Sequence, residues 1–212
     1  MAKGSKSNEG TISLFPLPIV QFPDACLPLH IFEQRYKTMI NDVLEENSAF
    51  GIVYCQGDDL EYAETGCSTR IVKVVRIPGG RMNILTLGER RFKSEGVIKH
   101  KPYLVARVVY FDDSATNEKC KSLSKEVLSV VDDILILSSK LADRQITMDD
   151  KIPDSPEKLS FWIAANFFKS PEDRQELLEM KSTATRLEEE LLILDATKKH
   201  LAARSSLKEA LG

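Results

Sequence analysis

The sequence lacks the features that mark a membrane protein, a disulfide-stabilised domain or a metal site. No apolar run approaches the roughly 20 residues that span a bilayer, and the polar residues 1–10 contain no apolar core of a signal peptide. No Cys-x-x-Cys pair and no histidine at ligand spacing occurs among the four cysteines, Cys26, Cys55, Cys67 and Cys120. We therefore expect a globular cytoplasmic protein with free, mostly buried thiols, no metal ion and no membrane contact.

Residues that could carry out catalysis are also scarce. The three histidines occupy distant segments, and none accompanies a serine or cysteine in a nucleophile signature. His30 lies between Leu29 and Ile31, where a structural histidine is the simpler interpretation. No Gly-x-x-x-x-Gly-Lys-Ser/Thr loop, which would cradle phosphates, occurs in the sequence. We predict that the chain has no catalytic residue, binds no cofactor and is not an enzyme. The enzymatic alternative is a hydrolase with an unrecognised site.

The charge of the chain argues against nucleic acid as a partner. The net charge is −3, and residues 1–112 contain 14 lysines and arginines against 13 acidic residues. Affinity for nucleic acid comes largely from neutralising phosphates and needs a basic excess. The one basic concentration comprises Arg90, Arg91 and Lys93, followed by residues 99–101. An RNA-binding module is therefore kept only as the alternative function.

Four prolines interrupt the apolar segment Leu14–Tyr36. Because proline fixes φ and lacks a backbone donor, this segment is predicted to form kinked, edge-like strands. Further along, apolar residues recur at every third or fourth position, which predicts an amphipathic helix. Its stripe is expected to comprise Phe32, Tyr36, Met39, Ile40, Val43 and Leu44.

Short strands and turns follow this helix. Residues 71–77 and 82–87 flank Pro78-Gly79-Gly80, which predicts a hairpin, and residues 103–111 predict a further strand. Many short strands with one early helix are typical of a twisted, partly closed barrel.

The pattern becomes helical beyond residue 113. Apolar spacing predicts a helix over Leu123–Leu141, and Ser155-Pro156-Glu157 and Ser170-Pro171-Glu172 are helix-start signals. A last helix is expected to begin near Ser182. Its leucine stripe favours packing within the domain, with a partner surface as the alternative. Solvent exposure is expected for Glu188, Glu189 and Glu190.

The predicted fold class is therefore α+β. We expect a disordered tail over residues 1–10, a β pseudo-barrel with one early helix over residues 11–113, and an α-helical bundle over residues 114–212.

Four blocks of the sequence resemble the amino-terminal substrate-binding domain of Lon-type ATP-dependent proteases. Leu14–Tyr36 is similar to its start, residues 66–92 to its central hairpin with a glycine before a paired-basic step, and Pro102–Val108 to the next strand. Residues 174–188, with a Leu-Leu-Glu step before Arg-Leu, resemble its helical part. The similarity is greatest to small standalone members of the cyanobacterial or plastid type.

The resemblance implies a PUA-like pseudo-barrel that binds unfolded or damaged polypeptides without catalysis. Such a protein would act as an adaptor or chaperone-like factor in protein quality control. The sequence shows neither the ATPase loop nor a Ser-Lys protease module, so a separate ATP-dependent protease is the implied partner. In a photosynthetic eukaryote the plastid stroma would replace the cytoplasm as its location.

Two clusters are candidates for contact with a bound polypeptide. In the first, Glu33 and Arg35 would form a polar rim beside an apolar groove at Phe32 and Tyr36. The alternative is structural: Glu33 favours the helix amino end, Arg35 packs its stem and pairs with an acid, and the two aromatic residues belong to the core. The second cluster comprises Arg90, Arg91 and Phe92, for which a structural or merely solvated role is equally open.

Overall fold

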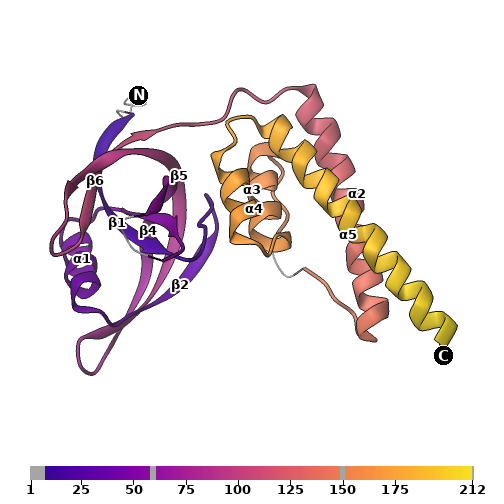
Figure 1. Ribbon diagram of the computed structural model, residues 1–212, viewed down its shortest axis with the longest axis horizontal. Helices are drawn as coiled ribbons and strands as arrows, with labels where there is room; N and C mark the ends of the chain where they lie inside the picture. The colour runs from indigo at the N-terminus through magenta and orange to yellow at the C-terminus, as the bar shows by residue number, and fades with distance from the viewer. Residues whose placement is uncertain (1–7, 58–60, 149–150, 212) are drawn as a thin grey trace. The chain divides into compact units, whose positions relative to one another are not determined.

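The computed structural model describes residues 8–57, 61–148 and 151–211, which form two compact units (Figure 1). The barrel unit comprises the described residues up to Asp112 together with Phe168–Glu179. The helical unit comprises Asp113–Phe167 and the described residues from Met180 onward. We had expected Phe168–Glu179 in the helical part, whereas these residues group with the barrel. Whether the two units fold as separate domains stays a prediction.

The barrel unit contains one six-stranded sheet in the order β2-β5-β4-β3-β1-β6. A further pairing of β5 with β6 closes five of these strands, all except β2, into a barrel. Only the β1–β3 pair is parallel. The predicted α+β fold class is confirmed. The strands are β1 (Glu9–Leu17), β2 (Cys26–Ile31), β3 (Phe50–Cys55), β4 (Tyr62–Ile77), β5 (Arg81–Lys99) and β6 (Leu104–Tyr110).

The predicted disordered tail is only partly within the described chain. Residues 1–7 lie outside the described residues. Glu9 and Gly10, which we also assigned to the tail, instead pair with Val109 and Val108 of β6. Pairing along a whole strand satisfies backbone groups that a tail would leave to water, so β1 begins earlier than the sequence indicated.

The parts of β4 and β5 next to their shared turn have different neighbours from the parts of these strands that lie in the barrel. β3 pairs with β4 only as far as Thr69, and residues 70–77 continue beyond the barrel with β5. There β2 pairs antiparallel with residues 82–87 of β5. We call this three-stranded part, residues 26–31, 70–77 and 81–87, the arm. The hairpin turn lies at the predicted place, with positive φ at Gly79 and Gly80.

Helix α1 (Gln34–Glu45) packs against the inner face of the arm and the adjoining end of the barrel (Figure 1). Four residues of its predicted stripe are buried, namely Tyr36, Met39, Ile40 and Val43. Phe32 is the exception, because it precedes the helix and is 60% exposed. The backbone of Glu33 is still extended, so Phe32 continues the alternation of β2 rather than the helical stripe.

The proline-rich connection between β1 and β2 lies tightly against β5. The backbone N–H of Asp24 donates to the carbonyl of Gly88, and the N–H of Gly88 donates to the carbonyl of Ala25, at 2.9 and 3.0 Å. A Cβ on Gly88 would lie only 2.1 Å from the carbonyl oxygen of Phe22. The close approach of two backbones therefore requires glycine at this position.

Helix α4 (Pro171–Glu179) belongs to the barrel unit and is attached to it by polar contacts. The side-chain amide of Gln175 donates to the carbonyl of Thr65 at 3.0 Å, and the guanidinium of Arg174 donates to the carbonyl of Val20 at 3.1 Å. The hydroxyl of Tyr54 donates to Glu172 at 2.7 Å. Leu177 and Leu178 of α4 are buried as well.

The helical unit is built from α2 (Glu118–Ala142), α3 (Pro156–Phe167) and α5 (Thr183–Leu211). The predicted starts at Pro156, Pro171 and near Ser182 are confirmed. Helix α5 packs against both α2 and α3. None of the helices in the described part of the chain is both long and apolar enough to cross a membrane.

A buried ion pair lies within this unit. The guanidinium of Arg186 pairs with Asp113 at 2.5 Å, and both side chains are almost fully buried. Arg186 also donates to the hydroxyl of Ser160 at 2.8 Å and to the carbonyl of Met180 at 3.0 Å. The buried guanidinium of Arg186, on α5, therefore links Asp113 at the start of the unit to Ser160 of α3.

The expectation that Glu188, Glu189 and Glu190 all face solvent is wrong for Glu190. Its side chain is fully buried, and neither carboxylate oxygen has a hydrogen-bond partner in the described structure. Burial raises its pKa well above the ordinary value, and the charge of Arg186 opposes this shift only in part. Helix α5 buries a wider arc than its leucine stripe because it contacts two helices.

Candidate functional site

The residues predicted at the start of α1 divide into accessible and buried ones. Phe32 is exposed, whereas Tyr36 is buried with its ring 4.0 Å from that of Phe15. Glu33 is the N-cap residue of α1, and its carboxylate pairs with the Nε of Arg35 at 2.9 Å. The guanidinium of Arg35 lies 4.4 Å from the centre of the Tyr36 ring. The two charged side chains therefore pair with each other, and a role in binding stays a prediction for them.

Arg90 lies in strand β5, not in a loop. Its guanidinium pairs with Asp112 at 3.3 Å and lies 4.9 Å from the centre of the Tyr110 ring. The neighbouring Lys93 pairs with Glu64 at 3.1 Å. These two basic side chains are matched by acids of the same unit, which reduces the positive charge that they offer to phosphates.

Arg91 and Phe92 are buried inside the barrel unit. Arg91 is 2% exposed, donates to the carbonyl of Leu178 at 2.9 Å and stacks on the ring of Phe111 at 4.5 Å. Phe92 is fully buried, and its ring would collide with any Cβ added at Gly51. Neither residue is accessible to a polypeptide in this structure. As the alternation of a strand requires, Arg90 and Arg91 point to opposite faces.

The structure does not bring the two predicted clusters together. Phe32 follows Ile31, which lies opposite Met82 at the outer end of β5. Arg90 lies eight residues further along the same strand, which corresponds to about 26 Å at roughly 3.3 Å per residue. Only Phe32 of these residues belongs to a larger accessible apolar surface.

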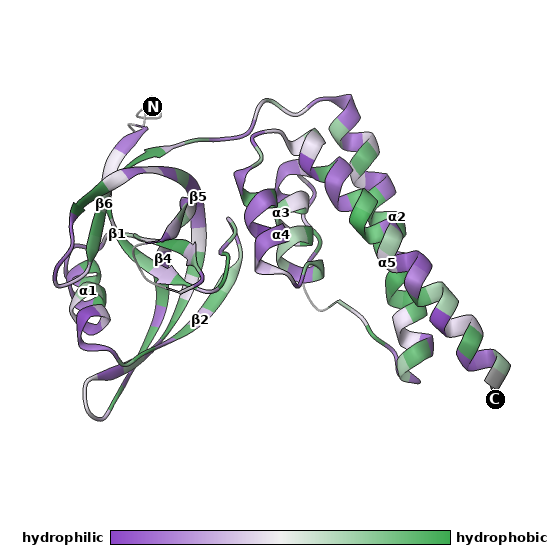
Figure 2. Ribbon diagram, viewed as in Figure 1, coloured by the Kyte–Doolittle hydropathy of each residue, from purple (hydrophilic) through white to green (hydrophobic). Residues whose placement is uncertain are grey.

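That surface is the outer face of the arm, which sequence analysis did not find. Strand register places four rows of residues across β2, β5 and β4 on the side away from α1. Val75 is 47% exposed there, and Leu85 and Leu87 of the central strand β5 are partly exposed. Figure 2 shows hydrophobic residues along these strands, including β2. Three rows span all three strands, namely Cys26–Leu87–Arg70, Pro28–Leu85–Lys73 and His30–Asn83–Val75. In the fourth, Arg81 pairs with Ile77, and Phe32, which directly follows β2, continues the alternation of that strand.

The signal for this face was present in the sequence as alternation within β2. Cys26, Pro28 and His30 are exposed, while Leu27 and Leu29 pack toward α1. Polar groups fix two side chains of the face: Nδ1 of His30 lies 2.6 Å from Oδ1 of Asn83, and the His30 ring stacks on Phe32 with centres 6.0 Å apart. Side chains that are already held in place lose little entropy on binding, and this holds for His30 and Asn83.

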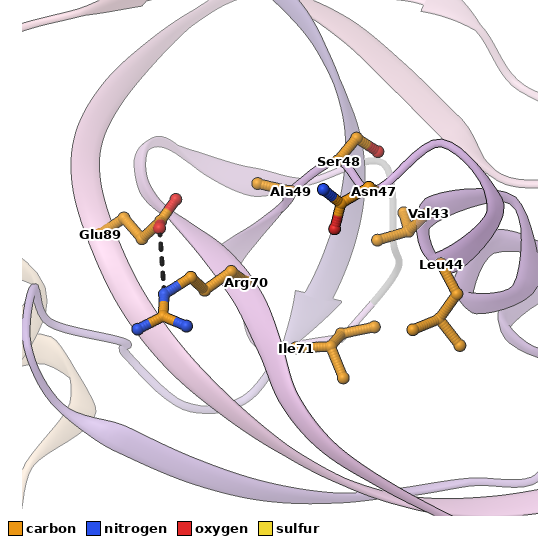
Figure 3. A pocket seen from close by; sticks show the side chains of 8 residues that line it. All are labelled: Val43, Leu44, Asn47, Ser48, Ala49, Arg70, Ile71 and Glu89. Atoms are coloured by element: carbon orange, nitrogen blue, oxygen red, sulfur yellow. Dashed lines mark ion pairs between the residues drawn. The ribbon is translucent and has the colours of Figure 1, made fainter.

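A surface hollow of about 320 Å³ adjoins the arm at Arg70 (Figure 3). Val43 and Leu44 of α1 face it from one side, and the ion pair of Arg70 with Glu89, 3.3 Å long, faces it from the other. The chain between α1 and β3 lines the rest. Its size is near the lower end for small-molecule sites, roughly 300 to 1,000 Å³. Its mixed lining gives no specific ligand chemistry.

Groups suited to catalysis or metal binding do not gather elsewhere in the described residues. No cluster of three His, Cys, Asp or Glu side chains that could hold a metal ion occurs there. Cys55, Cys67 and Cys120 are buried free thiols, and Cys26 is an exposed one. Burial raises the pKa of the Cys67 thiol to about 12. A thiol so rarely ionised is a poor nucleophile.

The comparisons with known proteins all indicate the same family. Residues 11–196 match the family of the ATP-dependent protease La (LON) substrate-binding domain. The chain is 27% identical over 197 residues to the Lon protease of Roseiflexus castenholzii, which covers 90% of this chain and 24% of that protein. It is 25% identical over 206 residues to Lon protease 2 of Myxococcus xanthus, with 90% and 24% covered. The chain thus spans about a quarter of the length of the curated relatives it matches.

Solved structures show the same fold. A Lon N-terminal domain protein from Xanthomonas campestris has a TM-score of 0.64 at 23% identity, with 86% of this chain and 98% of that chain covered. The N-terminal domain of a Mycobacterium avium complex Lon protease has a TM-score of 0.66 at 19% identity, with 90% and 98% covered. The barrel with its arm and the helical part are therefore the architecture of these domains.

Proposed function

The chain belongs to the family of the ATP-dependent protease La (LON) substrate-binding domain, and from this membership we propose that it binds unfolded or damaged polypeptides on the outer face of the arm. The observation that carries the proposal is the exposed apolar surface around Phe32 and Val75. Contiguous exposed apolar surface typically marks an interaction site. Unfolded chains differ from folded ones in offering aliphatic and aromatic side chains that such a surface can cover.

Side-chain contacts, rather than addition of a strand, support binding on this face. Pro28 lies in the edge strand β2 and cannot donate a backbone hydrogen bond. At the opposite edge, the register between Ile71 and Lys73 shifts, which makes a bulge in β4. Proline and bulges are devices that hinder pairing at sheet edges. We therefore infer that a client lies across the rows of the arm and is held by its apolar side chains.

Modest affinity follows from this mode of binding. A flexible segment loses conformational entropy when it is ordered on the arm, which offsets part of the apolar gain. Weak, reversible binding suits an adaptor or chaperone-like factor that passes its client to a separate ATP-dependent protease. The resemblance to standalone cyanobacterial or plastid-type members, the lack of catalysis by the chain itself and a cytoplasmic location are further parts of this proposal.

The proposal is tested by a two-dimensional NMR titration of the full chain with an unfolded model polypeptide. We expect chemical-shift changes at Phe32, Val75, Asn83 and Leu85, and none at the buried Phe92. A parallel titration with single-stranded RNA serves as the control for the rival function. Shift changes with RNA alone, or changes with the polypeptide that avoid the arm, would show that the proposed function or its site is wrong.

A further inference from the structure

The arm carries basic residues and no acidic one. Its three strand segments and the turn at residues 78–80 contain four basic side chains, Arg70, Lys73, Arg76 and Arg81. The barrel unit as a whole is nearly neutral, so the excess of basic residues is a local feature of the arm. Three of these four, all except Arg76, belong to the outer-face rows that also contain Val75, Leu85 and Phe32.

Two of these cations are available to a ligand. Arg70 pairs with Glu89, and Arg76 donates to Asn41 of α1 at 3.3 Å. Arg81 donates only to the carbonyl of Pro78 at 3.4 Å, which does not neutralise its charge. Across the described chain, Lys73 and Arg81 have no acidic partner, and both are exposed. Lys73 lies in β4 opposite Leu85, and Arg81 lies in β5 opposite Ile77.

We propose that the arm selects apolar segments that carry acidic residues beside the apolar ones. This inference rests on the proposed function and narrows its substrate class. A client with aspartate or glutamate near its apolar residues would pair with Lys73 and Arg81 while its apolar side chains cover Val75 and Leu85. A client with lysine or arginine in those places would meet like charge, which raises the dissociation constant.

The same cations favour polypeptide over nucleic acid. They alternate with aliphatic side chains, which a sugar-phosphate backbone cannot cover. Single-stranded nucleic acid is usually held by several aromatic side chains on which bases stack. The outer face offers Phe32 and the imidazole of His30, and these two rings already stack on each other.

The test uses three peptides with one aliphatic core and acidic, amide or basic flanks. Binding to the full chain is measured by fluorescence anisotropy at low and high ionic strength. An exposed charge pair is worth roughly 0.2–1 kcal/mol, so two pairs are expected to make the acidic peptide bind about two- to thirtyfold tighter than the amide peptide at low salt. High salt should remove this difference, because exposed charges are screened.

Charge-reversed variants locate the preference. The double variant Lys73→Glu, Arg81→Glu should bind the basic peptide more tightly than the acidic one. The control variant Arg107→Glu, Lys125→Glu has the same change in net charge outside the arm and should keep the preference of the wild type. Circular dichroism confirms that both variants fold.

The outcomes separate the inference from the proposed function. If the amide peptide binds but the flanking charges have no effect, the charge preference is wrong and the proposed function stands. If no peptide binds at all, the proposed function itself fails. Tighter binding of an oligouridylate than of the acidic peptide would overturn the inference in favour of a nucleic-acid surface.

Discussion

The guanidinium of Arg91, in strand β5, donates a 2.9 Å hydrogen bond to the carbonyl oxygen of Leu178, in the last turn of α4. A carbonyl in the last turn of a helix has no partner within the helix, and here a buried cation supplies one. The contact joins residues 87 positions apart. It gives Arg91 a structural role in attaching α4 to the barrel, whereas Arg90 remains at the surface.

Replacing Arg91 by alanine is expected to lower the free energy of unfolding by about 2–3 kcal/mol, because a buried carbonyl loses a charged donor. The matched change Arg90→Ala should cost less, about 1 kcal/mol, since it removes an ion pair whose acidic partner Asp112 is largely exposed. Urea denaturation followed by circular dichroism measures both. Equal costs for the two variants would refute the structural assignment of Arg91.

Alanine at Gly88 is expected to destabilise the barrel by about 1–3 kcal/mol or more, as overpacking against rigid backbone does. The new Cβ would lie 2.1 Å from the carbonyl of Phe22, and the β1–β2 connection would have to move. Gly10→Ala is the control, because its Cβ would make an ordinary contact of 3.7 Å with Tyr110. Thermal unfolding of the two variants should therefore differ clearly, with Gly10→Ala close to the wild type.

Local signals predicted much of this fold. The turn at Gly79-Gly80, the helix starts at Pro156 and Pro171 and the stripe of α1 depend on residues close in sequence, whose conformational preferences act locally. The barrel class followed from the number of short strands with one early helix. The family resemblance was equally visible, because its blocks lie in the same order along the chain.

Long-range contacts explain what could not be predicted. The partner of Arg91 lies on α4, so the sequence around residues 90–92 could not distinguish a buried arginine from an exposed one. Phe32 fitted a helical period by chance, and only the extended backbone of Glu33 shows that it lies outside the helix, directly after β2. Glu190 was assigned to solvent because the leucine stripe alone was expected to face inward, whereas α5 contacts both α2 and α3. The outer face of the arm required the register of three strands.

Glu190→Gln is expected to stabilise the helical unit by about 1–3 kcal/mol at neutral pH, because burial of Glu190 requires either a charge without hydrogen-bond partners or the uptake of a proton, and glutamine requires neither. The pKa of Glu190 is raised by burial, so the folded state binds a proton that the unfolded state has lost. The contribution of this residue is thus most favourable below its unfolded pKa, near 4.5, and becomes unfavourable as pH rises through the raised pKa.

The pH dependence of thermal unfolding measures this effect. The gain from Glu190→Gln should be largest at and above neutral pH and should shrink toward pH 4.5. Glu189→Gln, at a neighbouring and less buried position of α5, is the control and should change stability little at any pH. A gain from Glu190→Gln that is independent of pH would mean that folding does not raise the pKa of Glu190.

Asp113→Asn is expected to destabilise the helical unit by about 3–5 kcal/mol, the usual cost of removing one partner of a buried ion pair. Arg186 would keep its contacts with Ser160 and Met180, yet its buried charge would lose its counter-ion. Lys119→Gln removes the exposed pair with Glu188 in the same unit and should cost less than about 1 kcal/mol. Similar midpoints of urea denaturation for both variants would contradict this account.

The central claim, that the outer face of the arm binds unfolded polypeptide, is tested most directly by the affinity of the double variant Val75→Asn, Leu85→Asn for an unfolded model substrate. The control is Ile98→Asn, which polarises an exposed residue of β5 outside the arm and is 54% exposed. Isothermal titration calorimetry should show a dissociation constant at least about tenfold higher for the double variant, given roughly 0.8 kcal/mol per buried methylene, and an unchanged one for Ile98→Asn. An unchanged dissociation constant for a correctly folded Val75→Asn, Leu85→Asn variant would contradict the account.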